Sequence, residues 1–259
     1  MSGKTRFLSL VIFLFVLLMM FFGQANAAGD MDKSAYDAML KKYVSDGTVD
    51  YLKWKKNDFV TFEQYINSLA HMPVTNLSKN EQKAFWINTY NALTIYAVLK
   101  HIPANGLLAK FFSVQMVSGF FDKITYSVAS ETLTLNDIET KKLREVFRDP
   151  RIHFALVCAS RSCPEIQSAA FTAEGIDKRL DDAAKDFIQD NARNRLDRKN
   201  NVLRLSEIFR WYDSDFIASA GTVIDFVKKY MGKEGSAYLS AHTVKITYLF
   251  YDWLVNIKR

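Results

Sequence analysis

The feature that most limits the possible folds is a long helix that is apolar on nearly every side. Ser78, followed three residues later by Glu81, is the pattern of a capping box, and Pro103 closes the region. Between these points, apolar residues surround a helix that runs to about Lys100. Such a helix needs neighbours on all sides, so the sequence predicts that it lies at the centre of the fold.

Two amides interrupt this apolar helix. Asn88 and Asn91 are three residues apart and therefore share one face. A buried amide is costly unless it is hydrogen-bonded, so we expect both side chains to meet partners in the interior. A structural network that ties the helix to a neighbouring strand is the favoured interpretation. A role in orienting a catalytic residue or binding an oxyanion is the alternative.

The remaining pattern predicts a helix-rich α+β protein with a small, mainly antiparallel sheet. Further helices are expected over residues 32–44, 57–69, 136–144, 173–189, 223–230 and 236–240. Strands are expected over residues 123–128, 132–135, 152–158 and 244–255, with a hairpin over residues 194–205. In this scheme Asn136 caps the helix over residues 136–144.

The N-terminus has the order of a secretory signal peptide. Lys4 and Arg6 precede an apolar run, and the small residues 25–27 form a cleavage site of the A-x-A type. An uncleaved membrane anchor is the alternative, although the run is short for a spanning helix. We expect cleavage after Ala27, a single domain over residues 28–259, a periplasmic or secreted location, and no membrane segment in the mature protein.

The charge does not indicate a nucleic-acid-binding protein. Loss of Lys4 and Arg6 lowers the formal net charge from +6 to +4, and basic residues are mixed with acidic ones along most of the chain. We expect no nucleic-acid partner and no cofactor. The expected ligand is of unknown kind: a small molecule, a peptide or a component of the cell envelope.

The chain's only cysteines, Cys158 and Cys163, fall within one short segment. In an oxidising compartment they could form a structural disulfide. Alternatively, one is a nucleophile. Pro164 favours the first position of a helix, which would place Cys163 at the N-cap, where the helix dipole lowers a thiol pKa. Cys158 would end a buried strand, so the local sequence favours Cys163.

A thiol nucleophile needs a proton acceptor, and His153 is the histidine that lies nearest in sequence. On a regular strand it would be about 16 Å from Cys158 and on the opposite face. It could instead approach Cys163 through the loop. His242, just before the expected C-terminal strand, is the alternative acceptor, and the sequence does not choose between the two. Together, His153, Cys158 and Cys163 could also bind a metal, but their spacing fits no usual zinc pattern and no fourth ligand is evident, so no metal site is expected.

Four stretches of the chain resemble the domain-of-unknown-function family 547, which occurs in exported bacterial proteins and in plant proteins. They are Lys83–Ala92, Leu135–Glu139, Asp149–Pro164 and Tyr251–Trp253, and they span a family-like core of about residues 78–256. The family has no established function.

The resemblance changes which residues are favoured as members of the functional site. The family usually has histidine where this chain has Thr140, so that base is missing here. Plant members often have serine at the position of Cys163 and keep the cysteine at Cys158, which returns Cys158 to contention as the functional thiol. Under that pattern a Cys158–Cys163 disulfide could not be a requirement of the whole family. Supporting site residues in or near the motifs are Asn88, Asn91, Glu139, Arg144 and Asp252.

Two hypotheses of different classes follow. The first is an exported thiol-dependent hydrolase or acyl-transfer enzyme, with a papain-like or transglutaminase-like arrangement of Cys158, Cys163 and His153. The second is a non-catalytic binding or scaffolding module of the periplasm, in which a Cys158–Cys163 disulfide is structural.

Overall fold

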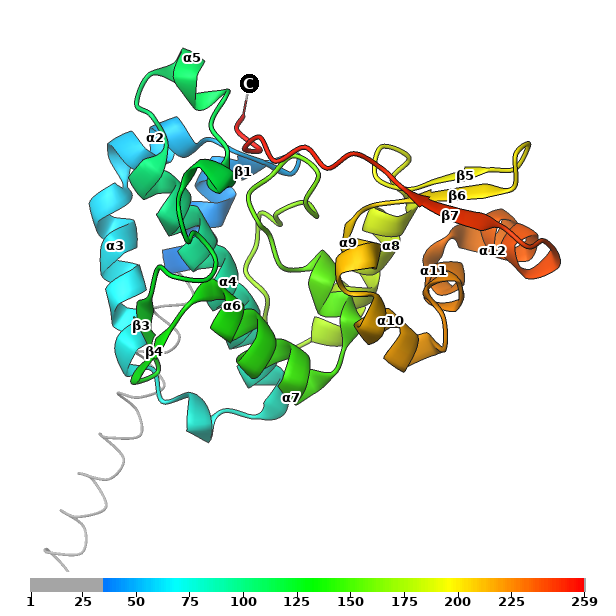
Figure 1. Ribbon diagram of the computed structural model, residues 1–259. Helices are drawn as coiled ribbons and strands as arrows, with labels where there is room; N and C mark the ends of the chain where they lie inside the picture. Colours follow the sequence, from blue (N-terminus) through cyan, green and yellow to red (C-terminus); the bar gives the residue numbers. More distant parts are fainter. Residues whose placement is uncertain (1–34, 259) are drawn as a thin grey trace, which may run out of the picture.

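The computed structural model describes residues 35–258. The expected signal peptide and its cleavage site lie outside these residues. Helices form most of the fold, and the strands form small sheets, which confirms the α+β class (Figure 1). Within residues 35–258, no helix combines the length and the apolarity needed to cross a membrane.

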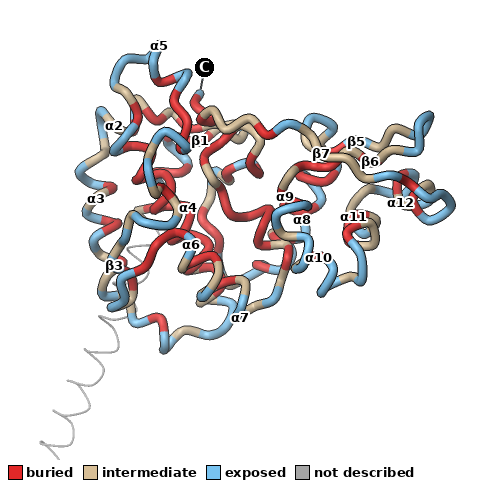
Figure 2. The backbone as a smooth tube through the Cα atoms, in the orientation of Figure 1, coloured by how far each residue is buried: buried red, intermediate tan, exposed pale blue. Residues whose placement is uncertain are grey.

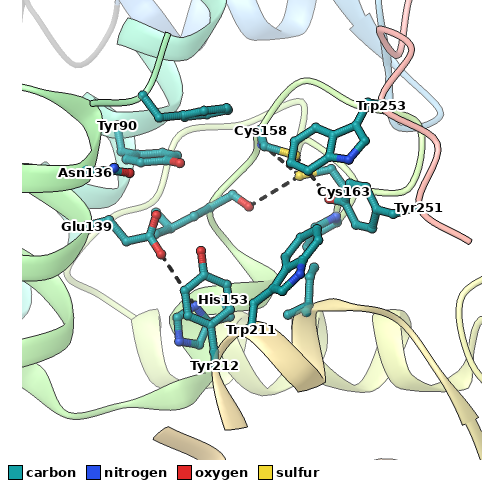
Figure 3. Close-up of a pocket in the computed structure, with 14 residues that line it drawn as sticks. Tyr90, Asn136, Glu139, His153, Cys158, Cys163, Trp211, Tyr212, Tyr251 and Trp253 are labelled. Atoms are coloured by element: carbon teal, nitrogen blue, oxygen red, sulfur yellow. Dashed lines mark hydrogen bonds and ion pairs between the residues drawn. The ribbon is translucent and has the colours of Figure 1, made fainter. Parts of the chain in front are cut away.

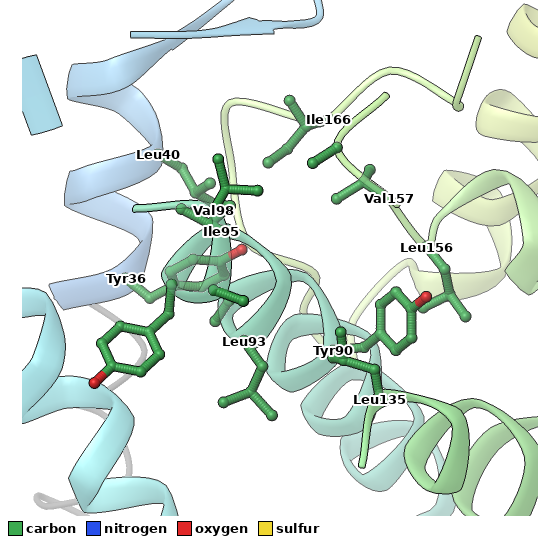
Figure 4. Packing of buried hydrophobic residues seen from close by; sticks show 14 of the residues in the cluster. Tyr36, Leu40, Tyr90, Leu93, Ile95, Val98, Leu135, Leu156, Val157 and Ile166 are labelled. Atoms are coloured by element: carbon green, nitrogen blue, oxygen red, sulfur yellow. The ribbon is translucent and has the colours of Figure 1, made fainter. Parts of the chain in front are cut away.

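The N-terminal part of the fold is built around the long helix α4. It begins with a helix over residues 35–43. The elements that follow are β1 (Val44–Ser45), β2 (Thr48–Val49), α2 (Tyr51–Asn57), α3 (Phe59–Ser68), η1 (Leu69–His71), η2 (Val74–Asn76) and α4 (Lys79–His101). The capping box is confirmed, because Ser78 and Glu81 each bond the other's backbone N–H. Helix α4 is buried over most of its length, as its pattern predicts (Figures 2 and 4).

Short elements connect α4 to the segment that carries the cysteines. They are α5 (Gly106–Ala109), η3 (Val114–Met116), β3 (Tyr126–Val128), β4 (Glu131–Leu133), α6 (Leu135–Asp137), the π-helix η4 (Ile138–Arg144), α7 (Glu145–Phe147) and the 3₁₀-helix η5 (Pro150–Phe154). Strands β3 and β4 form the expected antiparallel hairpin. The expected cap at Asn136 is wrong, because Thr134 caps this helix through a reciprocal bond with Asp137.

The C-terminal part packs as a second group of elements. They are α8 (Ile176–Gln189), β5 (Arg195–Asp197), β6 (Val202–Leu205), α9 (Ile208–Trp211), α10 (Asp213–Ala220), α11 (Val223–Tyr230), α12 (Gly232–Ala241) and β7 (Lys245–Tyr248). The predicted hairpin is β5 paired antiparallel to β6, and β7 adds to β6 in parallel. The sequence did not predict α2, α9 or α10.

The expected interior strand over residues 152–158 is wrong. Asp149 accepts a bond from the backbone N–H of Arg151, and Pro150 stands in the first turn, so the chain enters the short helix η5 instead. The residues after η5 bond to Asn91 of α4 rather than to a neighbouring strand. The segment therefore gains its hydrogen bonds from a side chain, and no sheet forms.

The helix expected to begin at Pro164 is also absent, because the chain stays irregular until α8 begins at Ile176. The C-terminal strand is shorter than expected. Only β7 pairs continuously, and the chain beyond it returns to the N-terminal part as an extended segment (Figure 1). Isolated bridges join this return segment to the core, at Leu254 with Ser113 and at Val255 with Ser160.

Two hydrophobic clusters fill the fold. One surrounds α4, and the other lies among α8, α9, α10, α11 and the sheet of β5, β6 and β7. Cys158 and Trp253 are partly buried against both clusters. The cysteine segment and the return segment therefore meet along the junction of the two clusters, which is a common place for a ligand site.

Candidate functional site

A cavity of about 240 Å³ opens beside the cysteines. Cys158, Cys163 and His153 all line it, so the structure brings the three expected side chains to one cavity (Figure 3). Glu139 lines it too, whereas Arg144 and Asp252 do not. The two sulfur atoms lie on one side of the cavity, and Glu139 and His153 lie on the other (Figure 3).

Asn91 fixes the backbone just before Cys158. Its Nδ2 donates to the carbonyl of Ala155 at 2.9 Å, and its Oδ1 accepts from the N–H of Val157 at 2.9 Å. Asn88 makes the equivalent pair of bonds with both backbone groups of Phe171, each at 2.8 Å. The expected interior partners of both amides are thus backbone groups. Asn91 is therefore a positioning residue for the backbone that leads into Cys158, whereas Asn88 holds the backbone at Phe171.

The return segment fixes the backbone after Cys158. The N–H of Asn256 donates to the carbonyl of Ala159 at 3.0 Å, and the N–H of Arg161 donates to the carbonyl of Leu254 at 2.9 Å. Asp252 takes part in the same contact, since its backbone N–H donates to Ser162 Oγ at 2.8 Å. Asp252 therefore supports the loop from outside the cavity.

The backbone immediately after Cys158 is strained. Ala159 has a φ of 62°, in the left-handed region that a residue with a Cβ seldom adopts. Such a conformation costs on the order of 1 kcal/mol and is common at functional sites. The bonds that hold both flanks of the loop maintain this conformation.

The two thiols have opposite environments. Burial would raise the pKa of the Cys158 thiol, but hydrogen bonds with Cys163, Ser160 and Tyr251 outweigh it and lower that pKa to about 7. Ser160 Oγ lies 3.1 Å from this sulfur, and the hydroxyl of Tyr251 lies 3.2 Å from it.

Both hydroxyls can donate to a thiolate. Burial and the negative charge at the neighbouring Cys158 raise the pKa of Tyr251, which therefore stays protonated and remains a donor.

Cys163 is the less reactive thiol. Its residue is buried, and burial together with the hydrogen bond and charge of Cys158 raises its pKa well above the ordinary value. Its sulfur accepts from the N–H of Cys158 and so supports the neighbouring loop. The local argument for Cys163 is wrong, because no helix begins at Pro164 to lower its pKa. Both cysteines are free thiols.

His153, which is buried, belongs to an ionic chain with the half-buried Asp215 and Arg144 on the other side of the cavity. Its Nε2 lies 2.8 Å from Asp215 Oδ2, and its ring stacks on Tyr212 with centroids 3.8 Å apart. The hydrogen bond with His153 and the paired guanidinium of Arg144 hold the pKa of Asp215 well below its usual range, although burial opposes them.

Arg144 binds Asp215 through two bonds, at 2.7 and 3.0 Å. Within residues 35–258, no hydrogen bond joins His153 to either sulfur.

Asp215 orients the imidazole of His153. A carboxylate at Nε2 favours the tautomer that carries its proton there, which leaves the lone pair on Nδ1. Nδ1 lies 4.0 Å from Glu139 Oε1 (Figure 3). His153 therefore presents a proton acceptor on the Glu139 side of the cavity and not at the sulfur.

Several residues that build the site were not singled out from the sequence. Ser160 lies inside the cysteine motif, and its spacing from Cys158 was the available signal. Trp211, Tyr212 and Asp215 lie in or beside α9 and α10, the helices that the sequence did not predict. No local signal connects Asp215 to a histidine 62 residues earlier.

Thr140 does not line this cavity. It lines a separate cavity of about 430 Å³ together with Arg144 and Asp215. Among residues 35–258, no group of three or more His, Cys, Asp or Glu side chains is arranged to hold a metal ion.

The comparisons with known proteins support the family resemblance. The model of the family described as "Protein of unknown function, DUF547" matches residues 74–188. This range holds α4 and both cysteines, and it ends before the return segment. Neither the curated proteins nor the solved structures include a match to this chain.

Proposed function

Because residues 74–188 carry the DUF547 match and that family has no assigned function, we propose from the site itself that this protein is a thiol-dependent hydrolase or acyl-transfer enzyme. Cys158 is the nucleophile. The observation that carries the proposal is a thiol that lines a cavity, has the hydroxyls of Ser160 and Tyr251 at its sulfur, and has a pKa lowered to about 7.

The lowered pKa supplies the nucleophile without a base in contact with the sulfur. At pH 7 a thiol with a pKa of about 7 is roughly half ionised, whereas an ordinary cysteine is ionised to a few per cent. This removes the need for a histidine beside Cys158. The distance between His153 and the thiol segment therefore does not contradict a thiol enzyme.

The proposed reaction has two steps. The Cys158 thiolate attacks the carbonyl carbon of an ester, thioester or amide, a C–S bond forms, and the bond to the leaving group breaks as that group takes up a proton. Water or a second nucleophile then attacks the thioester, and the thiolate of Cys158 leaves. The incoming nucleophile releases its proton to solvent, because His153 Nδ1 lies on the Glu139 side of the cavity and not at the sulfur.

Acylation by p-nitrophenyl acetate tests the proposal. We expect the wild-type protein to release nitrophenolate and to gain the mass of one acetyl group, and Cys158→Ser to do neither. Cys163→Ser is the comparison variant, and we expect it still to gain one acetyl group, because Cys163 is buried and protonated and a serine hydroxyl can take over its hydrogen bond with Cys158.

Equal acylation of wild type and Cys158→Ser would contradict the proposal. Intact mass tests the competing hypothesis of a structural Cys158–Cys163 disulfide. A native protein that is two hydrogens lighter than the reduced protein holds a disulfide and no free thiol.

Export is a second part of the proposal. Lys4, Arg6, the apolar run and the small residues up to Ala27 support a cleaved signal. The mass of the protein purified from the periplasm tests it, and we expect a chain that begins at Ala28. Recovery of the full-length chain from the membrane fraction would indicate an anchor instead.

A further inference from the structure

The walls of the cavity are mainly aromatic. Six aromatic side chains line it, namely Tyr90, Phe121, Trp211, Tyr212, Tyr251 and Trp253. Three of them pack on one another, with centroids 4.8 Å apart for Trp211 and Tyr251, 4.8 Å for Tyr251 and Trp253, and 5.6 Å for Trp211 and Trp253. Aromatic faces attract cations, and several of them around one space form a site for an organic ammonium group.

The charge of the cavity has the matching sign. Its lining includes no lysine and no arginine, and its single carboxylate is Glu139. Glu139 is only 7% exposed. Cys158 adds a second negative charge when it is ionised. The cavity therefore disfavours an anionic ligand and favours a cationic one.

Glu139 has no lysine or arginine as an ion-pair partner among residues 35–258. Its contacts are the hydroxyl of Tyr212 and, at 4.0 Å, His153 Nδ1. The nearby guanidinium of Arg144 is directed to Asp215, to which it donates two bonds. A buried carboxylate without a full counter-charge is costly, and a bound cation would relieve that cost.

The geometry also places two acceptors close together at this point. Glu139 Oε1 and His153 Nδ1 are two acceptors 4.0 Å apart. A single ammonium nitrogen can lie about 2.9 Å from both of them at once. A cavity of about 240 Å³ is smaller than a site for a drug-sized molecule, so it fits a small head group or the end of a longer chain.

We propose that this cavity binds a substrate that carries an organic ammonium group. The ammonium group contacts Glu139, His153 and the rings of Tyr90 and Tyr212 on that side of the cavity (Figure 3). The reactive carbonyl lies toward Cys158 on the opposite side, beside Tyr251 and Trp253 (Figure 3). This inference names the substrate class of the proposed enzyme and, as a statement about substrates, rests on that function. The binding of the cation itself does not require the thiol chemistry.

Ligand-observed NMR titration with n-butylammonium chloride tests the inference, and n-butanol is the uncharged probe of similar size. The Cys158→Ser protein is titrated alongside the wild type at matched chloride concentration. We expect butylammonium to bind at least about tenfold more tightly than butanol to both proteins. Equal affinity for the two probes would overturn the inference, and this comparison needs no variant of Glu139.

Substitution of the carboxylate locates the site. We expect Glu139→Gln to lose about tenfold or more in affinity for butylammonium and to keep its affinity for butanol. Glu145→Gln is the matched control, because this substitution removes the same charge from an exposed residue outside this cavity. The same loss in both variants would mean a general charge effect and would contradict the assignment.

The two proposals fail in different ways. If Cys158 does not acylate but Cys158→Ser still prefers butylammonium in a manner that depends on Glu139, the enzyme proposal is wrong and the cation site stands as that of a binding protein. If Cys158 acylates and no probe preference is found, the enzyme proposal stands and the ammonium inference is wrong.

Discussion

Replacement of Asn91 tests whether its amide positions the backbone that leads into Cys158 or contributes only to the stability of the fold. In Asn91→Ala, the carbonyl of Ala155 and the N–H of Val157 lose their partner, and both residues are buried. Each unsatisfied buried group costs about 1–3 kcal/mol, and alanine returns roughly 0.5 kcal/mol of helix propensity. We therefore expect a loss of about 2–5 kcal/mol in the free energy of unfolding, measured by urea denaturation.

Asn88→Ala is the matched control on the same helix. It removes two bonds of the same kind from the buried residue Phe171, so we expect a similar loss of stability. The two variants should differ at the thiol. In Asn91→Ala, the loop that aligns the donors at Cys158 loosens, and the midpoint of its alkylation with pH should rise toward the ordinary cysteine value of about 8.5.

We expect Asn88→Ala to leave that midpoint near its native value. An equal shift in the two variants, or no shift in Asn91→Ala despite the loss of stability, would refute the idea that Asn91 positions the thiol.

Two further predictions concern single groups of the site. Tyr251→Phe removes a donor that favours the charged form of Cys158, so the pKa of that thiol should rise by on the order of 1 unit. The absorbance of the thiolate measures this pKa. An unchanged or lower pKa would mean that the bond from Tyr251 does not stabilise the thiolate. Asp215 has a lowered pKa in the folded protein, so the stability that it contributes is present above its unfolded value of about 3.9 and is lost as the pH falls below it. Urea denaturation across the acid range should therefore show a shallower loss for Asp215→Asn than for wild type, and equal slopes would contradict the ionic chain.

The sequence predicts the parts of the fold that depend on local patterns. The capping box at Ser78 locates the start of α4, and the apolar residues around that helix predict its burial. The hairpin of β5 and β6 and the helix α11 follow from the alternation and periodicity of their residues. In each of these cases, the groups that decide the structure lie within a few residues of one another.

The segment from Asp149 to Cys158 shows where local reasoning fails. Its apolar residues suit a strand, but Asp149 and Pro150 start a short helix, and Asn91 supplies the hydrogen bonds that a sheet would have supplied. The preference for Cys163 depended on a helix that does not form. The favoured thiol is instead decided by hydrogen bonds with Cys163 and Ser160 in the same loop and with Tyr251, which is distant in sequence and reaches the loop through the return segment.

The pH dependence of the alkylation rate by iodoacetamide, followed by mass spectrometry of the peptide that contains Cys158, tests the central claim most directly. Cleavage after Arg161 places Cys158 and Cys163 on separate peptides, so the measurement is made on the wild-type protein. We predict a single midpoint near pH 7, where the pKa of Cys158 lies, and rapid labelling of the native protein. A midpoint at or above the ordinary value of about 8.5, or labelling only after denaturation, would contradict the claim that the fold stabilises a thiolate at this cavity.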